Sequence, residues 1–316
     1  MSRVLITGIE GFVGRHLAGR LLESGHKVIG IHLAPCTGLD RVELHCHDIR
    51  DFEFLRAVLA DARPERVVHL AAVSSVAESE THVLETYDVN AVGTLRLLEA
   101  VRQSAPRARV LLVSSAEVYG RGPAAGPFTE QSPALPVSPY ALSKLAAEEA
   151  GRFSHRAFGL DVVILRPFSH TGPGQSPRFV FPTVARRIAE LERAGGGVIE
   201  LGNLDTRRDY TDVRDICRAY ELALERCEPG ETYNITSSRP VLIRDGVEAL
   251  CRLARVPVEY RTVAERLRER DIPLLSGSSD RFVQATGWRP EIPFDQTLTD
   301  LLAYWRTRVA ADATAR

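Results

Sequence analysis

Strong net charge, long apolar stretches and paired cysteines are all missing from this chain of 316 residues. Its formal net charge is -1 at pH 7, so it carries no basic field that would attract nucleic acid or an anionic membrane. No apolar stretch approaches the roughly 18 residues of a membrane-spanning helix. An apolar strand is expected to begin at Arg3, and the charged and apolar regions of a secretory signal peptide do not precede it. We therefore expect a cytoplasmic protein without membrane or nucleic-acid partners.

Disulfide and metal-binding patterns are missing as well. The five cysteines form no C-x-x-C pair and their odd number suits reduced thiols; they are Cys36, Cys46, Cys217, Cys227 and Cys251. The run from His45 to Asp48 contains potential metal ligands, but successive side chains on a strand alternate between its faces. No second ligand pair is evident, so the sequence predicts no metal site.

Lysine is the scarcest charged residue, and Lys27 and Lys144 are its only two occurrences. Lys144 follows Tyr140 by four residues, a spacing that chance would produce about 0.05 times in this composition. On a helix, residues four apart share one face, so the phenol and the ammonium would project together. A lysine can contact a ribose hydroxyl, and its charge lowers the pKa of a nearby phenol from about 10. The pair predicts proton-transfer chemistry, with an exposed helical pair as the alternative.

A glycine-rich turn follows the first apolar strand, Arg3–Thr7. Gly8, Gly11 and Gly14 recur at intervals of three, and a helix is expected from Arg15 onward. Glycines allow a tight turn and let the backbone approach a pyrophosphate, while the helix N-terminus offers free N–H groups to the anion. A strand, a glycine turn and a helix in this order predict a dinucleotide site. A purely structural turn is the alternative.

Strands and helices alternate through the first half of the chain. Strands are expected at 3–7, 27–31, 42–45, 66–71, 110–114 and 161–165, and helices at 15–23, 51–59, 85–105 and 139–158. This alternation predicts an α/β fold with a doubly wound parallel Rossmann sheet. Beyond residue 167 the pattern changes, although a helix at 212–226 and a strand at 232–236 resemble Rossmann elements. We expect a Rossmann domain over 1–167 that also receives about 206–236, and a smaller, discontinuous substrate-binding domain within 168–316.

Several motifs together resemble a known family. In chain order they are Thr7-Gly8-x-x-Gly11-x-x-Gly14, Asp48-Ile49, His69-Leu-Ala-Ala72, Asn90-Ala-Val-Gly93, Ser114-Ser115-Ala-Glu-Val-Tyr-Gly120 and Tyr140-x-x-x-Lys144. They resemble the extended short-chain dehydrogenase/reductases that modify nucleotide sugars. Three later segments, 166–175, 176–182 and 208–215, are similar to the branch that acts on GDP-6-deoxyhexoses. One departure is Ser169, where that branch usually has asparagine.

The resemblance implies roles for four catalytic residues. Tyr140 would protonate a carbonyl oxygen as hydride reaches the carbon, and Ser115 would donate a second hydrogen bond to that oxygen. Lys144 would hold the nicotinamide ribose and lower the pKa of Tyr140. Glu117 stays ambiguous, because it could bind sugar hydroxyls in a reductase or remove the C5 proton in a dehydratase.

The cofactor is expected to be NADP(H), with NAD(H) possible. An NAD-binding fold usually carries a carboxylate after its second strand, and this chain has His32-Leu33-Ala34-Pro35 there. Arg15 or Arg41 could reach a 2′-phosphate. The expected cofactor-binding residues are Gly8, Gly11, Phe12, Val13, Gly14, Asp48, Ile49, Leu70, Ala71, Ala72, Tyr140, Lys144 and His170.

A GDP-sugar is the expected substrate, and its diphosphate suits the planar fork of arginine. The expected substrate-binding residues are Ser74, Ser75, Ser115, Glu117, Ser169, Arg178 and Arg208. The resemblance implies NAD(P)H-dependent reduction of GDP-4-dehydro-6-deoxy-D-mannose to GDP-D-rhamnose by a homodimer. The alternatives are a GDP-mannose 4,6-dehydratase, another nucleotide-sugar 4-reductase or 4-epimerase, and a non-enzymatic dinucleotide sensor.

Overall fold

The computed structural model describes residues 1–33, 37–121, 126–263 and 272–314, and they divide into two compact units. Unit 1 consists of Met1–Pro167, Ile216–Ile235 and Ser278–Trp288. Unit 2 consists of Phe168–Asp215, Thr236–Gly277 and Arg289–Arg316. The chain therefore leaves unit 1 after residue 167 and returns to it twice.

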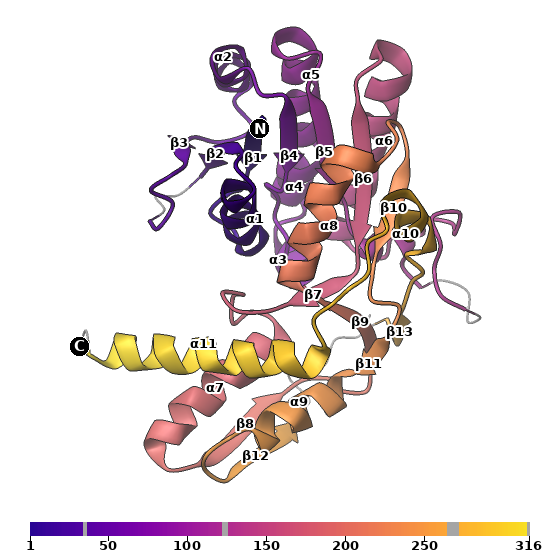
Figure 1. Ribbon diagram of the computed structural model, residues 1–316. Helices are drawn as coiled ribbons and strands as arrows, with labels where there is room; N and C mark the ends of the chain where they lie inside the picture. The colour runs from indigo at the N-terminus through magenta and orange to yellow at the C-terminus, as the bar shows by residue number, and fades with distance from the viewer. Residues whose placement is uncertain (34–36, 122–125, 264–271, 315–316) are drawn as a thin grey trace. The chain divides into compact units, whose positions relative to one another are not determined.

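Unit 1 is built on a seven-stranded sheet in which every neighbouring pair is parallel. The strand order is β10-β6-β5-β4-β1-β2-β3, which Figure 1 shows from right to left. The strands are β1 (Arg3–Thr7), β2 (Lys27–His32), β3 (Glu43–Cys46), β4 (Arg66–His69), β5 (Arg109–Val113), β6 (Val162–Pro167) and β10 (Thr232–Ile235). The chain winds one way from β1 to β3 and the other way from β4 onward, so β1 and β4 flank the topological switch point where ligands bind in such sheets. The predicted doubly wound parallel sheet is confirmed.

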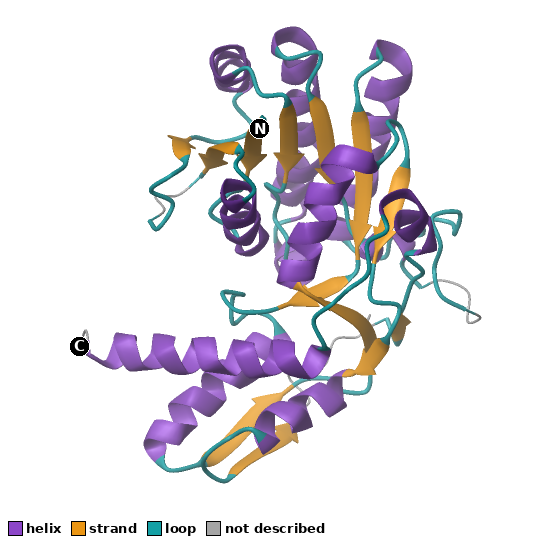
Figure 2. Ribbon diagram, viewed as in Figure 1, coloured by secondary structure: helices purple, strands orange, loops and turns teal. Residues whose placement is uncertain are grey.

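Helices cover the sheet, as the alternating purple and orange elements of Figure 2 show. The longer ones are α1 (Phe12–Glu23), α2 (Phe52–Ala62), α5 (Gly93–Ser104), α6 (Pro139–Phe158) and α8 (Val213–Arg226), and the short ones are α3 (Val76–Thr81), α4 (Val83–Tyr87), η2 (Ala116–Tyr119) and α10 (Asp280–Thr286). Leu55 of α2 and Leu97 of α5 join the buried cluster that contains Leu5 and Val110 of the sheet. The central strands are buried along nearly their whole length, as a parallel sheet between helices requires.

Several element ends lie one to three residues from those expected from the sequence, and two of the differences change the local structure. The expected strand 66–71 ends at His69, because the backbone N–H of Ala71 turns to bond the Thr7 hydroxyl at 3.2 Å. The expected single helix 85–105 is interrupted by a widened turn, η1 (Asp88–Val92), in which the Gly93 N–H bonds the carbonyl of Asp88, five residues back. Such turns are rare in helices and often mark functional sites.

The widened turn places the side chain of Asn90 against the segment that follows β4. Its Oδ1 accepts from the Val73 N–H at 2.8 Å, and its Nδ2 donates to the Val73 carbonyl at 3.1 Å. The same Nδ2 donates to the Ser143 hydroxyl at 2.9 Å, and Ser143 donates to the carbonyl of Tyr140 at 2.8 Å. Asn90 therefore connects the end of β4 to α6.

A second chain of hydrogen bonds runs through the buried ring of His69. The ring contacts the Thr7 hydroxyl through Nδ1 at 2.7 Å and the Thr94 hydroxyl through Nε2 at 2.9 Å. Thr94 donates its own proton to the Asn90 carbonyl, so its oxygen is left to accept from Nε2–H of His69. Nδ1 then accepts from Thr7, and the neutral ring is satisfied at both nitrogens. Burial, together with the charge of Lys144, lowers the pKa of His69 to about 3.

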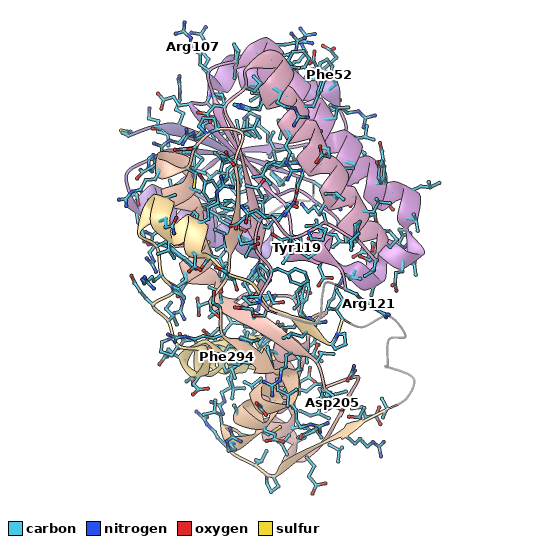
Figure 3. The ribbon with its side chains drawn as sticks, turned by 90° about the vertical axis from the view of Figure 1, so that its right-hand side faces the viewer. Phe52, Arg107, Tyr119, Arg121, Asp205 and Phe294 are labelled. Carbon is cyan, nitrogen blue, oxygen red and sulfur yellow. The ribbon has the colours of Figure 1, made fainter. Side chains whose placement is uncertain are left out.

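In the part of unit 2 that the structure describes, there are two small sheets and three longer helices. One sheet joins β11 (Pro240–Leu242), β9 (Arg207–Asp212), β13 (Leu274–Leu275) and β7 (Ser169–Thr171), and the other pairs β8 (Gly197–Leu201) with β12 (Val258–Thr262). The helices are α7 (Val180–Ala194), α9 (Ile243–Arg252) and α11 (Phe294–Thr314). Its core includes the mutually packed rings of Phe181, Tyr210 and Phe294, the last of which is labelled in Figure 3. Among the described residues, no helix has the length and apolarity needed to cross a membrane.

The buried neutral ring of His69 makes stability depend on pH. Its pKa of about 3 in the folded protein lies below the ordinary value of 6.5, so stability is complete above pH 6.5 and falls as pH drops toward 3. We expect this one group to remove about 2 kcal/mol of unfolding free energy at pH 5. The variant His69→Gln keeps a donor toward Thr94 and cannot ionise. Urea unfolding at pH 7 and pH 5 should show a smaller pH-dependent loss in the variant, and equal losses would contradict a buried neutral histidine.

Candidate active and dinucleotide site

The glycine turn after β1 is shaped by contacts that exclude larger residues. Gly8 has φ +70°, and a Cβ added to it would lie 2.8 Å from the Cα and N of Ala71. A Cβ on Gly14 would lie 2.6 Å from the Gly8 carbonyl oxygen and 2.7 Å from Cα of Ile9. The turn therefore packs against the segment after β4 on one side and against the first turn of α1 on the other.

This turn fits the pyrophosphate of a dinucleotide. Gly11 is the N-cap of α1 and supplies no side-chain cap, so the first N–H groups of the helix are not taken by a capping side chain. The nearby positive end of the helix favours an anion. The glycine turn and the first turn of α1 both lie at the switch point between β1 and β4, where sheets of this type bind nucleotides.

The other expected cofactor residues of unit 1 surround the same edge of the sheet. Leu70 N–H bonds the Thr7 carbonyl at 3.2 Å, and Ile49 is buried within reach of Gly93, whose added Cβ would lie 3.0 Å from Cδ1 of Ile49. Asp48 follows β3 and is held by Arg50, whose hydrogen bonds lower the pKa of that carboxyl despite some burial. Ala34 and Pro35 lie outside the described residues.

Ser115 and Tyr140 form the centre of the candidate catalytic site. Ser115 follows β5 and caps η2, where its hydroxyl accepts from the Glu117 N–H at 3.2 Å. Its side chain lowers the pKa of the Tyr140 phenol. Tyr140 lies in the first turn of α6, where Ser138 caps the helix and the Ser79 hydroxyl accepts from the Tyr140 N–H at 3.1 Å. Both side chains are only 9% exposed, so little water competes for their hydrogen bonds.

The pKa of Tyr140 departs from the value expected from the sequence. Lys144 was expected to lower it, but burial is the largest effect and raises it to about 12. The Ser115 side chain lowers this pKa, and the negative charge of Glu117 raises it. At neutral pH the phenol therefore retains its proton.

Lys144 lies one helical turn after Tyr140 and is 5% exposed. Its Nζ donates to the carbonyl of Val113, the last residue of β5, at 2.8 Å. An ammonium has three donors, so this bond leaves others for a ribose. Burial lowers the pKa of Lys144 to about 8, and the charge of Glu148 opposes that shift.

Glu148 is a buried site residue that the sequence analysis missed. It is fully buried and accepts from the guanidinium of Arg166 through two bonds of 2.9 and 2.7 Å. Ser114 donates to it at 2.5 Å and Arg152 at 2.7 Å. Burial would raise its pKa, but these partners lower it overall, so the carboxylate stays charged. The spacing of Tyr140, Lys144 and Glu148 at intervals of four was the available signal.

Arg166 extends this network to Tyr119. Its Nη1 donates to the Tyr119 hydroxyl at 3.0 Å, and Tyr119 donates to Oδ1 of Asn234 in β10 at 2.7 Å. Tyr119, labelled in Figure 3, is fully buried and stacks on Phe128. The network therefore joins the segment after β5 to β6 and β10.

Glu10 is a second residue that the sequence analysis missed. It stands inside the glycine turn, and its Oε1 accepts from the Leu33 N–H at 3.1 Å. Its Oε2 is buried without a hydrogen-bond partner among the described residues. A carboxylate between Gly8 and Gly11 was visible in the sequence but was not assigned a role.

The two serines expected to bind the hexose differ in their exposure and in their hydrogen bonding. Ser74 is exposed, whereas the Ser75 hydroxyl caps α3 by accepting from the Glu78 N–H at 3.2 Å. Because the Ser75 hydroxyl already accepts this bond, fewer of its hydrogen-bonding positions are left for a ligand.

The remaining expected residues belong to unit 2. Ser169 begins β7 and pairs with Tyr210 of β9, the strand that carries Arg208. His170 Nδ1 contacts the Phe168 carbonyl at 3.0 Å, and burial lowers the pKa of this ring. Arg208 donates to the Ile272 carbonyl at 2.6 Å, while Arg178 is exposed.

Comparison with known proteins agrees with this arrangement. The family described as GDP-mannose 4,6 dehydratase matches residues 5–301. The chain belongs to this family of extended short-chain dehydrogenase/reductases. The resemblance drawn from the sequence motifs is thereby confirmed.

One curated relative and two solved structures indicate the range of the family. GDP-6-deoxy-D-mannose reductase of Pseudomonas aeruginosa is 34% identical over 98% of this chain and 98% of its own length. The structure of RMD from Pseudomonas aeruginosa with NADPH has a TM-score of 0.86 and 34% identity, and the match covers 98% of this chain and 100% of that chain. The structure of UDP-glucose 4-epimerase of Thermus thermophilus with NAD has a TM-score of 0.86 and 29% identity. That match covers 96% of this chain and 99% of that chain.

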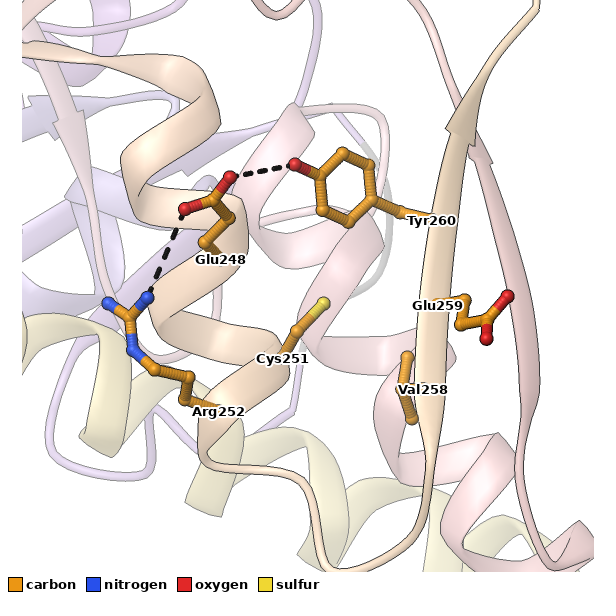
Figure 4. A pocket seen from close by; sticks show the side chains of 6 residues that line it. All are labelled: Glu248, Cys251, Arg252, Val258, Glu259 and Tyr260. Carbon is orange, nitrogen blue, oxygen red and sulfur yellow. Dashed lines mark hydrogen bonds and ion pairs between the residues drawn. The ribbon is translucent and has the colours of Figure 1, made fainter.

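Two other features of the described residues are a groove in unit 2 and the run from His45 to Asp48. In unit 2, a groove of about 530 Å³ is lined by residues of α9 and β12, including Glu248, which bonds the Tyr260 hydroxyl at 2.9 Å (Figure 4). It contains none of the expected site residues. The run from His45 to Asp48 gathers no metal-binding cluster in the described part of the chain, and its His47 instead contacts Asp51 at 2.8 Å.

The glycine turn can be tested by Gly14→Ala. The added methyl meets backbone atoms at 2.6 to 2.7 Å, so we expect a loss of about 1–3 kcal/mol in stability and weakened dinucleotide binding. Gly19→Ala on the same helix is the matched control, because no atom lies within 4 Å of its added Cβ. It should stabilise the helix by up to about 1 kcal/mol. Similar melting temperatures and NADPH affinities for both variants would contradict this packing.

Proposed function

We propose that this protein reduces the C4 ketone of GDP-4-dehydro-6-deoxy-D-mannose to GDP-D-rhamnose, with NADPH as the favoured reductant and NADH possible. The observation that carries the proposal is the burial of Ser115, Tyr140 and Lys144 after β5 and in the first turns of α6, where the phenol keeps its proton. The similarity to GDP-6-deoxy-D-mannose reductase along nearly the whole chain supports this substrate.

The bound dinucleotide would supply the hydride. Tyr140 would deliver its proton to the carbonyl oxygen, and the Ser115 hydroxyl would stabilise the charge that develops there. Lys144, anchored on the Val113 carbonyl, would present its remaining donors to the nicotinamide ribose. Its charge would also stabilise the phenolate that remains after proton transfer.

Carbonyl reduction needs this phenol in its protonated form. A reductase needs an acid at this position, whereas a dehydratase or an epimerase begins by removing a proton from a sugar hydroxyl and needs a base there. Burial raises the pKa of Tyr140 to about 12, which stabilises the acid form.

Substrate recognition is proposed for residues of both units. In unit 1, Ser74, Ser75 and Glu117 would contact the hexose. In unit 2, Ser169, Arg178 and Arg208 would contact the sugar nucleotide, and His170 would contact the nicotinamide half of the cofactor. The exposed guanidinium of Arg178 suits a diphosphate.

GDP-mannose 4,6-dehydratase is the second candidate function. Glu117 favours it, because the carboxylate lies close enough to Tyr140 to raise the pKa of the phenol and could serve as a base at sugar C5. The family that matches the chain also carries the name of that enzyme.

Dimer formation and a cytoplasmic location stay predictions. Large apolar side chains are exposed on α4, α5 and α6, including Leu84, Leu95, Leu142 and Phe153, and a two-fold partner could cover them. We therefore expect a homodimer. Light scattering would contradict it by giving the 34.9 kDa mass of the single chain at micromolar concentration.

The proposed reduction predicts that NADPH is consumed only when the 4-keto GDP-sugar is supplied. Tyr140→Phe removes the acid and little volume, so we expect turnover to fall by roughly 10² to 10⁴ while NADPH affinity changes only a few-fold. Absorbance of NADPH and a fluorescence titration measure the two quantities. Normal turnover in this variant would exclude Tyr140 as the proton donor.

The role of Glu117 separates the two candidate functions. Reduction requires a hydride and one proton, neither of which comes from this carboxylate, so Glu117→Gln should keep measurable NADPH-dependent turnover and mainly raise KM. Dehydration needs the base, and its removal would cost on the order of 10² to 10⁴ in rate. Conversion of GDP-mannose by the wild-type protein without net cofactor consumption, abolished in Glu117→Gln, would establish the dehydratase instead.

A further inference from the structure

The carboxylate of Glu10 lies at the carboxyl end of β2, although Glu10 itself belongs to the glycine turn after β1. The N–H groups of Gly8 and Ile9 both bond the carbonyl of Ile31, at 2.8 and 3.3 Å, so the turn runs beside the last residues of β2. The next residue, Glu10, then accepts from the Leu33 N–H at 3.1 Å. The end of β2 is where dinucleotide-binding folds hold the adenosine ribose, usually with an acidic residue of the strand itself.

The second oxygen of Glu10 needs a hydrogen-bond donor. Oε2 is buried and has no partner among the described residues, and a buried acceptor without a donor is unfavourable. A ribose 2′-hydroxyl is a donor. A 2′-phosphate offers only acceptor oxygens at neutral pH and carries a negative charge, which a carboxylate repels.

Arg15, in the first turn of α1, would instead favour the 2′-phosphate of NADPH. Its Nε donates to the Glu10 carbonyl at 2.9 Å and its Nη1 to the Thr37 carbonyl at 2.7 Å, so its guanidinium lies between the glycine turn and the segment after β2. A guanidinium binds phosphate well, and these backbone bonds leave some of its five donors for a ligand.

We propose that Glu10 is the residue that keeps the site open to NADH, by accepting the adenosine 2′-hydroxyl and opposing the 2′-phosphate that Arg15 attracts. The inference rests on the proposed function, because it assumes that the glycine turn binds a nicotinamide dinucleotide. Glu10 would determine cofactor choice from the glycine turn, whereas the usual acidic determinant lies at the end of β2. The balance between Glu10 and Arg15 sets the ratio of the two affinities.

The test is direct binding without any sugar. The dissociation constants of NADPH and NADH are measured by fluorescence titration for the wild type and for Glu10→Gln, which keeps an acceptor for the Leu33 N–H. Removing the like charge should shift the ratio of affinities toward NADPH by about 10-fold or more. Adenosine 2′,5′-bisphosphate and adenosine 5′-phosphate, used as displacing ligands, should show the same shift, because they carry only the adenosine half.

The matched control is Glu23→Gln at the far end of α1, which changes the net charge equally and should leave the ratio unchanged. Arg15→Gln should move the ratio toward NADH, and Glu10→Ser gives a second readout if the glutamine variant folds poorly. A ratio in both Glu10 variants within about two-fold of the wild type, or a shift toward NADH, would overturn the inference and leave the proposed function intact. Failure of the wild type to bind either dinucleotide would overturn both.

Discussion

The buried charge of Glu148 is the constraint on which the arrangement of the candidate catalytic residues depends. A carboxylate in the core is stable only if it is fully paired, and here Arg166, Ser114 and Arg152 bring donors from β6, from the end of β5 and from α6. Breaking such a pair costs about 3–5 kcal/mol, because the remaining partner keeps an uncompensated charge. The helix that carries Tyr140 and Lys144 is therefore fixed against the strand end that carries Ser115.

A second set of buried hydrogen bonds ties the dinucleotide turn to the same helix. Thr7 ends β1, and its hydroxyl connects through His69 to Thr94. Thr94 leads to Asn90 in the widened turn, which reaches the Tyr140 carbonyl through Ser143. Every member of this chain is buried and hydrogen-bonded, so the turn beside Gly8 and the first turn of α6 are held in one geometry. A hydride acceptor and its proton donor need that kind of fixed relation.

Much of unit 1 could be predicted because its signals are local. The glycine spacing, the apolar strands and the interval between Tyr140 and Lys144 each depend on a few neighbouring residues. The pKa of Tyr140, the buried role of Glu148 and the position of Glu10 depend on packing between distant segments, and periodicity carries no information about it. The widened turn at Asn90 was missed for the same reason, since it goes together with a pair of bonds to Val73 in a distant segment. Unit 2 was hardest to predict, because its short strands lack a clear alternating pattern.

The most direct test of the account is the fate of the hydride. The 4-keto GDP-sugar is incubated with NADPH that carries deuterium at nicotinamide C4, in the transferable position, and the sugar is analysed by NMR and mass spectrometry. The account predicts one deuterium at C4 of a 6-deoxyhexose product and one equivalent of oxidised cofactor. A product without deuterium, or conversion of GDP-mannose to a 4-keto sugar with the cofactor returned unchanged, would contradict it.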